Sequence, residues 1–244
     1  MTLDSGSATE AEGLLVELGA QQPREWRIRW YRAIAQMAQA RPDQAVISFD
    51  EVCSAVPGEL APKLALGLAS ESAGDLSAAA RWYEVVARTS PSITSAPFGL
   101  ARCRLHAGDR VGALAAYERV PETSSGYIDA QTARIRCLSA GDGDHGATLD
   151  ELVEAGSALE ALPLEVHQRE RLAADLLDTA LRMTVAGKAV DDGQARVLGL
   201  PFAERELRLA LERSYRELAR YAATRDERIA LVEDANRVRP RTWI

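Results

Sequence analysis

Residues that could bind a metal or act as nucleophiles are few in this chain of 244 residues, and they lie far apart in the sequence. They comprise three histidines and three cysteines: His106, His145, His167, Cys53, Cys103 and Cys137. Metal sites usually gather such residues at short spacings such as CxxC or HxxxH, and neither spacing occurs here. We therefore predict no metal and no disulfide framework. We interpret the cysteines as small buried side chains of helices in a reducing cytoplasm.

One polar stretch combines glycines and aspartates in a way that resembles two binding loops. Gly141, Gly143 and Gly146 match GxGxxG, but this motif binds dinucleotides where it follows a strand, and no strand is predicted before it. Asp142 and Asp144 resemble the start of a calcium loop, which needs an acidic residue at its twelfth position, where this chain has valine. The motifs GxxxxGK[ST], HExxH and GxSxG do not occur. We therefore expect a solvated turn, no catalytic residue and no cofactor.

The charge and hydropathy of the chain narrow the possible partners. The net charge is −7, from 29 basic and 36 acidic residues, and an acidic balance argues against nucleic acid as the main partner. No apolar run is long enough to span a bilayer. Residues 1–13 lack the basic flank and apolar centre of a secretory signal. We therefore expect a cytoplasmic protein whose partners are other proteins.

The strongest pattern is a repeat of 34 residues that occurs three times. Equivalent pairs stand where the first helix of each copy should end: Ala40-Arg41, Gly74-Asp75 and Gly108-Asp109. Alanines and then aromatic residues follow at constant spacing: Ala45, Ala79, Ala113, Phe49, Tyr83 and Tyr117. Prolines close the first two copies at Pro57 and Pro91. This period and this order of small and aromatic residues are typical of tetratricopeptide repeats, each of which is a pair of antiparallel helices.

The repeated residues have a physical reason for their positions. A turn glycine adopts positive φ at little cost, and the aspartate after it can accept hydrogen bonds from nearby backbone N–H groups. Leu66-Gly67 and Leu100-Ala101 occupy matching places in the first helices, where a small residue lets two helices approach closely. One such hairpin cannot bury its apolar face alone, so neighbouring hairpins must stack.

These signals predict an all-α fold, a right-handed tetratricopeptide superhelix of about eleven helices with no strand. Residues 1–24 should hold a disordered segment over 1–12 and the stub of a truncated helix at Leu14–Leu18. Residues 25–122 should form the three repeat units. Residues 123–244, where the period fades, should form repeat-like and capping helices. The expected helices of this last part are residues 127–139, 150–162, 165–186, 201–223 and 225–238, with a loop over 187–199.

The alignment of the three units predicts a partner-binding face on their first helices, which line the concave side of such stacks. Its first row is Trp30, Leu64 and Phe98, its second row is Ile34, Leu68 and Arg102, and its third row is Met37, Glu71 and Leu105. Domains that grip a C-terminal carboxylate have lysine in the first row and asparagine in the second, and this chain has neither. The rows instead suit an apolar helix or segment. The alternative is that they pack internally or against a sibling domain, which would leave no open groove.

Several stretches also resemble the C-terminal region of the actinobacterial serine/threonine protein kinase G family. They are WRIRWYRA at 26–33, PGELAPKLAL at 57–66, FGLAR at 98–102, AGDRVGA at 107–113, Val120-Pro121, LGLPF at 198–202, LRL at 207–209 and ANRVRP at 235–240. The resemblance runs from about Trp26 to the C-terminus. It implies a tetratricopeptide region that follows a redox-sensitive rubredoxin-like segment and a kinase domain.

No kinase residue carries over to this chain, which has no glycine-rich nucleotide loop on a strand, no HRD and no DFG. The resemblance implies either a piece of a longer kinase or a separate gene. It implies roles in dimerisation and in supporting the kinase, and a parent kinase that phosphorylates a small forkhead-associated-domain regulator of 2-oxoglutarate and glutamate metabolism. The expected partners are the chain's own kinase domain, a second copy of the chain in a homodimer, or a signalling protein. A free-standing adaptor and, more remotely, an all-α enzyme or small-ligand sensor are the alternatives.

Overall fold

The computed structural model describes residues 5–140, 146–188 and 193–240. These residues form twelve helices and two short strands. The chain divides between Ser124 and Ser125 into two compact units, which we call the N-terminal unit and the C-terminal unit. Most of the glycine and aspartate turn, including His145, lies outside the described residues, so the expectation of a solvated turn stays a prediction.

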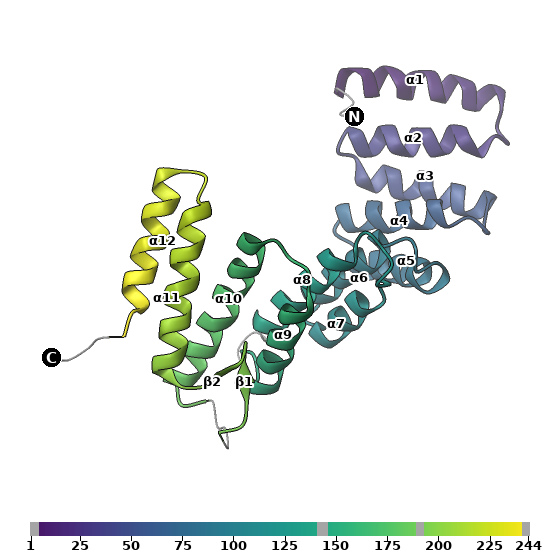
Figure 1. The fold of residues 1–244 in the computed structure, drawn as a ribbon. Helices are drawn as coiled ribbons and strands as arrows, with labels where there is room; N and C mark the ends of the chain where they lie inside the picture. Colours follow the sequence, from purple (N-terminus) through teal and green to yellow (C-terminus); the bar gives the residue numbers. More distant parts are fainter. Residues whose placement is uncertain (1–4, 141–145, 189–192, 241–244) are drawn as a thin grey trace. The chain divides into compact units, whose positions relative to one another are not determined.

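The N-terminal unit consists of seven helices, and each helix packs against the next along the chain. Figure 1 shows the first four as neighbouring layers. Their bounds are α1 Ser5–Gln21, α2 Trp26–Ala38, α3 Pro42–Ala55, α4 Leu60–Ser72, α5 Leu76–Thr89, α6 Ser95–His106 and α7 Arg110–Glu118. The second helices of the three repeats begin at Pro42, Leu76 and Arg110, 34 residues apart. The repeat of the sequence is therefore a repeat of helix pairs.

The turns inside the three pairs have the backbone that the sequence predicts. Gly74 and Gly108 have φ of 86° and 75°, and Ala40 has φ of 54° although it carries a Cβ atom. The next residue then caps the second helix: the Asp75 carboxylate accepts from the Ala78 N–H at 2.9 Å, and Asp109 accepts from the Gly112 N–H at 2.8 Å. Because the donor and the acceptor of each bond lie only three residues apart, these caps can be predicted from the sequence.

Small residues bring the helices of neighbouring pairs together around Tyr83. Its ring lies against two glycines, because a Cβ atom added at Gly67 would stand 3.1 Å from the ring and one added at Gly99 would stand 2.4 Å from Cζ. Ala79, four residues before Tyr83, and Ala101, two residues after Gly99, are fully buried. In the first repeat, Ala33, Ala45 and Phe49 belong to one buried cluster. The core of the unit is thus built from aromatic residues set into gaps left by glycine and alanine.

The N-terminus differs from the expectation. Residues 5–12, expected to be disordered, are helical and belong to α1, so Leu14–Leu18 is part of a helix of 17 residues. Glu12 ties this helix to α2 and to the turn after it, because its carboxylate pairs with Arg41 and accepts hydrogen bonds of 3.3 Å from both Gln36 and Gln39. Burial raises the pKa of Glu12, but the bonds from Arg41 and Gln36 outweigh burial and hold it below its usual value. Such long-range partners cannot be seen in a local pattern.

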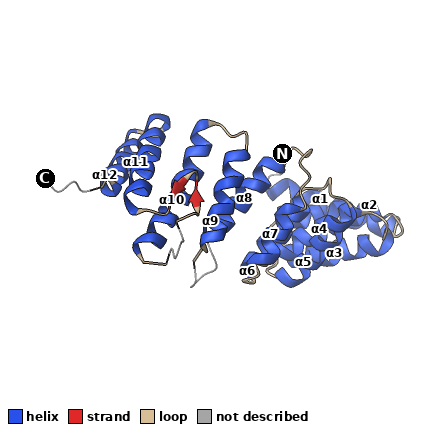
Figure 2. Ribbon diagram, turned by 60° about the horizontal axis from the view of Figure 1, so that its bottom comes forward, coloured by secondary structure: helices blue, strands red, loops and turns tan. Residues whose placement is uncertain are grey.

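The C-terminal unit consists of five helices and a small hairpin. Figure 2 shows the hairpin, in red, beside these helices. The helices α10, α11 and α12 pack in succession, and α8 packs against both α9 and α10. The bounds are α8 Tyr127–Ala140, α9 Leu149–Ala161, α10 Val166–Val185, β1 Arg196–Val197, β2 Leu200–Pro201, α11 Glu204–Tyr221 and α12 Arg225–Val238.

The hairpin corrects two expectations, that the chain has no strand and that Pro201 opens a helix. Arg196 pairs with Pro201 and Val197 with Leu200, and α11 begins only at Glu204. Leu198 and Gly199 turn the chain with φ of 50° and 72°, as in a tight hairpin turn. Strands of two residues are too short to show the alternation by which strands are recognised in a sequence.

The cysteines lie where the sequence predicts. Cys53, Cys103 and Cys137 are all buried, and each lies in a helix of the described structure. Burial raises the pKa of the Cys53 and Cys103 thiols. No helix among the described residues is both long and apolar enough to cross a bilayer.

Candidate partner-binding surfaces

The structure places the residues of the predicted partner-binding face on the three first helices of the repeats. Helix α2 contributes Trp30, Ile34 and Met37, and α4 contributes Leu64 and Leu68. Helix α6 contributes Phe98, Arg102 and Leu105. Their side chains differ widely in exposure, so the face divides into an inner and an open part.

The inner part of the face is occupied by packing within the N-terminal unit. Trp30, Ile34 and Met37 are half-buried against the core cluster that contains Phe49. The Trp30 and Phe49 rings meet edge to face with centroids 5.3 Å apart, a favoured aromatic geometry. Phe98 meets Tyr117 in the same way at 5.8 Å. The alternative of internal packing therefore holds for these residues in part.

The apolar side chains that the fold leaves open on this face are two leucines. Leu68 on α4 is 50% exposed and Leu105 on α6 is 42% exposed. Single exposed leucines are common on protein surfaces, so exposure alone identifies no function. Their relevance comes from their equivalent faces on two neighbouring first helices.

Glu71 and Arg102 join α4 to α6 on this same face. The Arg102 guanidinium donates from Nε and Nη2 to the two Glu71 carboxylate oxygens at 2.7 and 2.8 Å, and the Tyr83 hydroxyl donates to Glu71 at 2.7 Å. The bond from Arg102 and that from Tyr83 hold the pKa of Glu71 below its usual value despite burial. Burial and the Glu71 contact raise the pKa of Tyr83. The two residues stand in different rows of the alignment, and no sequence pattern indicates that they pair.

A small aromatic pocket of about 180 Å³ opens where α2 and α4 begin. Trp30 takes part in it, so one residue of the predicted face also lines a hollow. The Arg27 guanidinium lies 4.9 Å from the centre of the Trp26 ring. The residues lining the pocket are Trp26, Arg27, Trp30, Tyr31, Glu59, Ala61 and Pro62.

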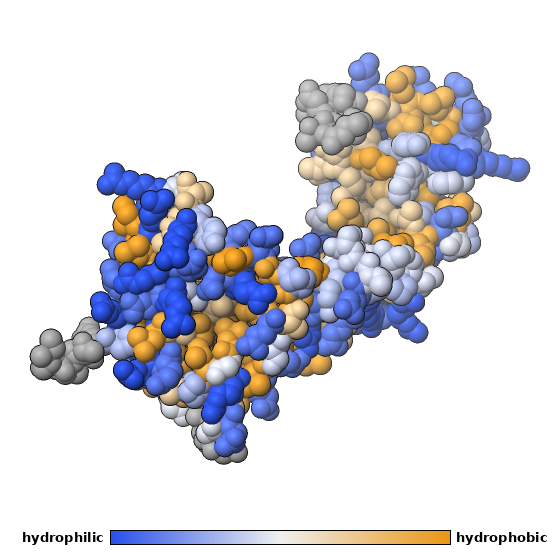
Figure 3. All heavy atoms as spheres, viewed as in Figure 1, coloured by the Kyte–Doolittle hydropathy of each residue, from blue (hydrophilic) through white to orange (hydrophobic). Residues whose placement is uncertain are grey.

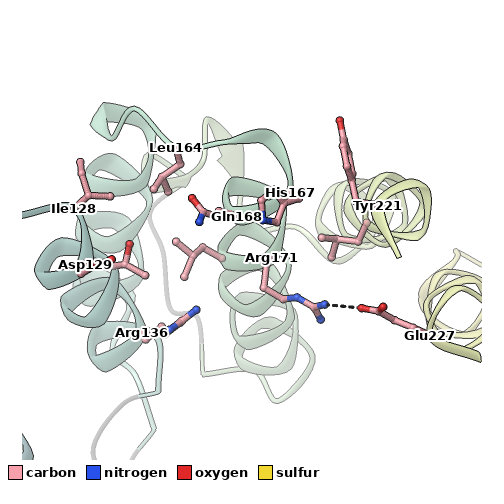
Figure 4. A pocket seen from close by; sticks show the side chains of 12 residues that line it. Ile128, Asp129, Arg136, Leu164, His167, Gln168, Arg171, Tyr221 and Glu227 are labelled. Atoms are coloured by element: carbon pink, nitrogen blue, oxygen red, sulfur yellow. Dashed lines mark ion pairs between the residues drawn. The ribbon is translucent and has the colours of Figure 1, made fainter. Parts of the chain in front are cut away.

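A larger cavity of about 320 Å³ lies in the C-terminal unit, which contains none of the predicted site residues. Figure 4 shows Arg136 and Gln168 directed into this cavity from α8 and α10, and Arg171 paired with Glu227 at 3.6 Å on its far side. Sequence reasoning missed it because the lining comes from four helices and the segment after α9, beyond the clear repeats. The lining residues are Ile128, Asp129, Thr132, Arg136, Leu164, His167, Gln168, Arg171, Leu172, Leu218, Tyr221 and Glu227.

The exposed chemistry of the two units differs. Figure 3 shows hydrophilic residues predominating on the visible sides of α11 and α12, whereas apolar residues are interspersed over the visible side of the N-terminal unit. Among the described residues, no group of three or more His, Cys, Asp and Glu side chains is arranged to hold a metal ion. The notable surfaces of the described structure are therefore a mixed apolar face and a polar cavity.

Two solved structures have a similar fold. Yeast Tom70 aligns with 94% of this chain and 43% of its own, with a TM-score of 0.55 and 16% identity. A tetratricopeptide repeat protein from Parabacteroides merdae aligns with 95% of this chain and 93% of its own, with a TM-score of 0.53 and 11% identity. These likenesses support the fold alone and confirm an all-α tetratricopeptide architecture.

Two curated relatives are much closer in sequence. The serine/threonine-protein kinase PknG of Mycolicibacterium smegmatis is 37% identical over 238 residues, and that of Mycobacterium leprae is 36% identical over the same length. Each match covers 98% of this chain and 31% of the relative, so the chain spans about a third of the length of either kinase. Residues 1–242 match the family described as protein kinase G tetratricopeptide repeat. The chain therefore belongs to the protein kinase G tetratricopeptide repeat family.

Proposed function

We propose that this chain is a protein-interaction and regulatory domain of a kinase G-like protein, and that it performs no catalysis of its own. The observation that carries the proposal is the pair of open leucines, Leu68 and Leu105, on equivalent sides of α4 and α6. Stacked helix pairs offer extended surfaces for binding other proteins. Membership of the kinase G repeat family supports the link to a kinase.

The two leucines are suited to contact with a partner because the fold does not need them for its own core. Trp30 and Phe98 are engaged by Phe49 and Tyr117, whereas about half of the Leu68 surface is open to solvent. Between them the pair of Glu71 and Arg102 fixes α4 against α6. Covering the leucines would stabilise a complex by about 25 cal/mol for each Å² of apolar surface removed from water.

The wider roles are those implied by the resemblance to the kinase G family, and they are proposals for this chain. As part of a serine/threonine kinase, the domain would bind and stabilise its own kinase domain, pair with a second copy, or recruit a signalling partner. A forkhead-associated-domain regulator of glutamate and 2-oxoglutarate metabolism is the substrate that we propose for the parent kinase. The experiment that follows distinguishes binding to the rest of the kinase from pairing with a second copy.

The test replaces the open leucines and leaves the packed aromatic residues intact. The double variant Leu68→Asp, Leu105→Asp should weaken one of two interactions by about tenfold or more. The first is binding to the M. smegmatis kinase from which the region similar to this chain has been removed, and the second is self-association. Calorimetric titration measures the first and sedimentation equilibrium the second. Trp30→Glu is a poorer choice, because it would also break the contact with Phe49.

The matched control is Val111→Asp on α7, since Val111 is 78% exposed and lies on a second helix. This variant should bind as the unmodified chain does, and both variants should keep the helical circular dichroism signal. If the double leucine variant binds and self-associates like the unmodified chain, this face is not the binding surface.

A further inference from the structure

The large cavity of the C-terminal unit continues into a second hollow along the same helices. The second hollow, of about 280 Å³, shares Arg136 and Leu172 with the first. Helix α10 lines both from His167 to Arg182, a rise of about 22 Å at 1.5 Å per residue. Together the two hollows form one elongated groove, which we call the α8–α10 groove. A groove of this length spans about six or seven extended residues at about 3.3 Å each.

Several polar groups in the groove have unused hydrogen-bonding capacity. Among the described residues, the side chains of Asp129, Thr132, Arg136 and Gln168 make no hydrogen bond or ion pair. They include both donors and acceptors, because the carboxylate only accepts, the guanidinium only donates, and the hydroxyl and amide do both. Asp129, Thr132 and Arg136 are three and four residues apart on α8 and so share one side of it.

The charges of the groove nearly balance, with three arginines against four carboxylates. The first hollow has two arginines and two carboxylates, with Arg171 already paired with Glu227. The second hollow shares Arg136 with the first and adds Arg182, Asp175 and Asp178, with Arg182 paired with Asp178 at 3.0 Å. A groove with an excess of only one negative charge repels a strongly anionic ligand slightly and attracts a cationic one only weakly. Its complement is a neutral group with alternating donors and acceptors.

The floor of the groove is apolar. Leu172 and Leu218 are buried beneath it, and Leu164 and Ile128 are half-buried at its edge. Such a floor accepts an apolar side chain while the surrounding polar groups fix its orientation.

We propose that the α8–α10 groove binds an extended, uncharged peptide segment of a protein partner, holding its main-chain N–H and C=O groups with Gln168, Arg136, Thr132 and Asp129. An extended main chain presents alternating donors and acceptors, as these side chains require. A helical ligand has already satisfied its main-chain groups internally, so it would leave the polar groups of the groove unpaired. A compact small molecule would fill one hollow and leave the other empty. This site is separate in the sequence from Leu68 and Leu105, so the inference goes beyond the function proposed above.

The test begins with a random heptapeptide display library selected on the full chain. The enriched peptides are synthesised with acetylated and amidated ends, and their affinities are measured by fluorescence anisotropy. Gln168→Ala and Arg136→Ala should each weaken binding about tenfold, as the loss of a hydrogen bond to ligand does. Arg220→Ala is the matched control, because Arg220 is exposed, pairs only with Glu217 in the described structure, and does not line the groove. It should change affinity less than about twofold.

Two further measurements distinguish a main-chain contact from other modes of binding. Methylation of the peptide backbone nitrogens should weaken binding by about tenfold. Raising NaCl from 50 to 500 mM should change the affinity less than about twofold, because an uncharged peptide forms no ion pair with the groove. The proposal would be overturned if the Gln168→Ala and Arg136→Ala variants bound the peptides as tightly as the unmodified chain does. No effect of backbone methylation, a steep salt dependence, or the absence of any enriched peptide would each overturn it as well. Circular dichroism and thermal unfolding check that the variants fold, and we expect no change because both side chains are exposed.

Discussion

At the scale of single residues, the three repeat turns have the same left-handed backbone conformation, but the residue that adopts it is glycine in two turns and alanine in the third. Gly74 and Gly108 adopt positive φ without penalty, whereas Ala40 adopts φ of 54° with a Cβ atom. A left-handed conformation costs a residue other than glycine about 1 kcal/mol. The first repeat therefore contains a small amount of strain that the other two lack.

We predict that Ala40→Gly stabilises the chain by about 0.5 to 1 kcal/mol, since relief of the left-handed strain exceeds the entropy that glycine loses on folding. Urea unfolding measures the change. The matched control is Ala107→Gly, because Ala107 has φ of −84° and gains no such relief. A lower stability for Ala40→Gly would show that the alanine turn is not strained.

The pair of Glu71 and Arg102 leads to a prediction that depends on pH. Glu71→Gln should destabilise the chain by about 1 kcal/mol at pH 7, a modest value because half of the Arg102 side chain is exposed. The pKa of Glu71 is lower in the folded chain than its ordinary 4.5. Its stabilising effect is therefore complete above that value and is lost as the pH falls through the folded pKa.

The difference in unfolding free energy between Glu71→Gln and the unmodified chain should consequently shrink as the pH falls below the ordinary Glu71 pKa of 4.5. Urea titrations at several pH values measure it. Glu122→Gln provides the control, since Glu122 is exposed in the loop after α7 and should show no such trend. A difference that stays constant with pH would mean that the charge of Glu71 does not contribute.

At the scale of the elements, the parts of the fold that could be predicted are those encoded locally. The paired helices follow from turn residues and from small residues at fixed spacing, such as Gly74, Asp75 and Ala79. The helix α1 could not be predicted in full, because the partners of the Glu12 carboxylate lie at least 20 positions away in the sequence. The hairpin at Val197 was missed because its strands are too short for a pattern, although Val197 is fully buried.

The candidate binding surface could be predicted only in outline. Register placed Leu68 and Leu105 on one face, but it could not distinguish them from Trp30, which the core cluster half buries. Exposure depends on how neighbouring helices pack, and this is a property of the tertiary structure. The α8–α10 groove was missed for the same reason, since its lining residues carry no repeated spacing.

The close approach of helices α4, α5 and α6 leads to a further prediction. Gly99→Ala should destabilise the chain by about 1 to 3 kcal/mol, because the new methyl group would overlap the Tyr83 ring. Thermal or urea unfolding measures this loss. The control is Gly58→Ala, where an added Cβ atom meets no atom within 4 Å. If Gly99→Ala is as stable as the unmodified chain, Tyr83 does not fill the gap between the helices as tightly as described.

At the scale of the whole molecule, family and fold have separate support. Structures with at most 16% identity establish the helical repeat architecture, whereas the kinase relatives at 36% and 37% identity establish the family. The chain spans only 31% of those relatives. Its proposed role therefore depends on what the repeats bind, and the open leucines of the N-terminal unit are the surface to test first.

Site-specific photo-crosslinking tests this central claim most directly. Benzoylphenylalanine replaces Leu68 or Leu105, and each variant is irradiated alone and with the part of the M. smegmatis kinase outside the match. We predict a crosslinked product of higher mass from both positions in at least one of the two samples. We predict little product when benzoylphenylalanine replaces Val111. No product, or as much product from position 111, would contradict the claim that the first helices form the binding face.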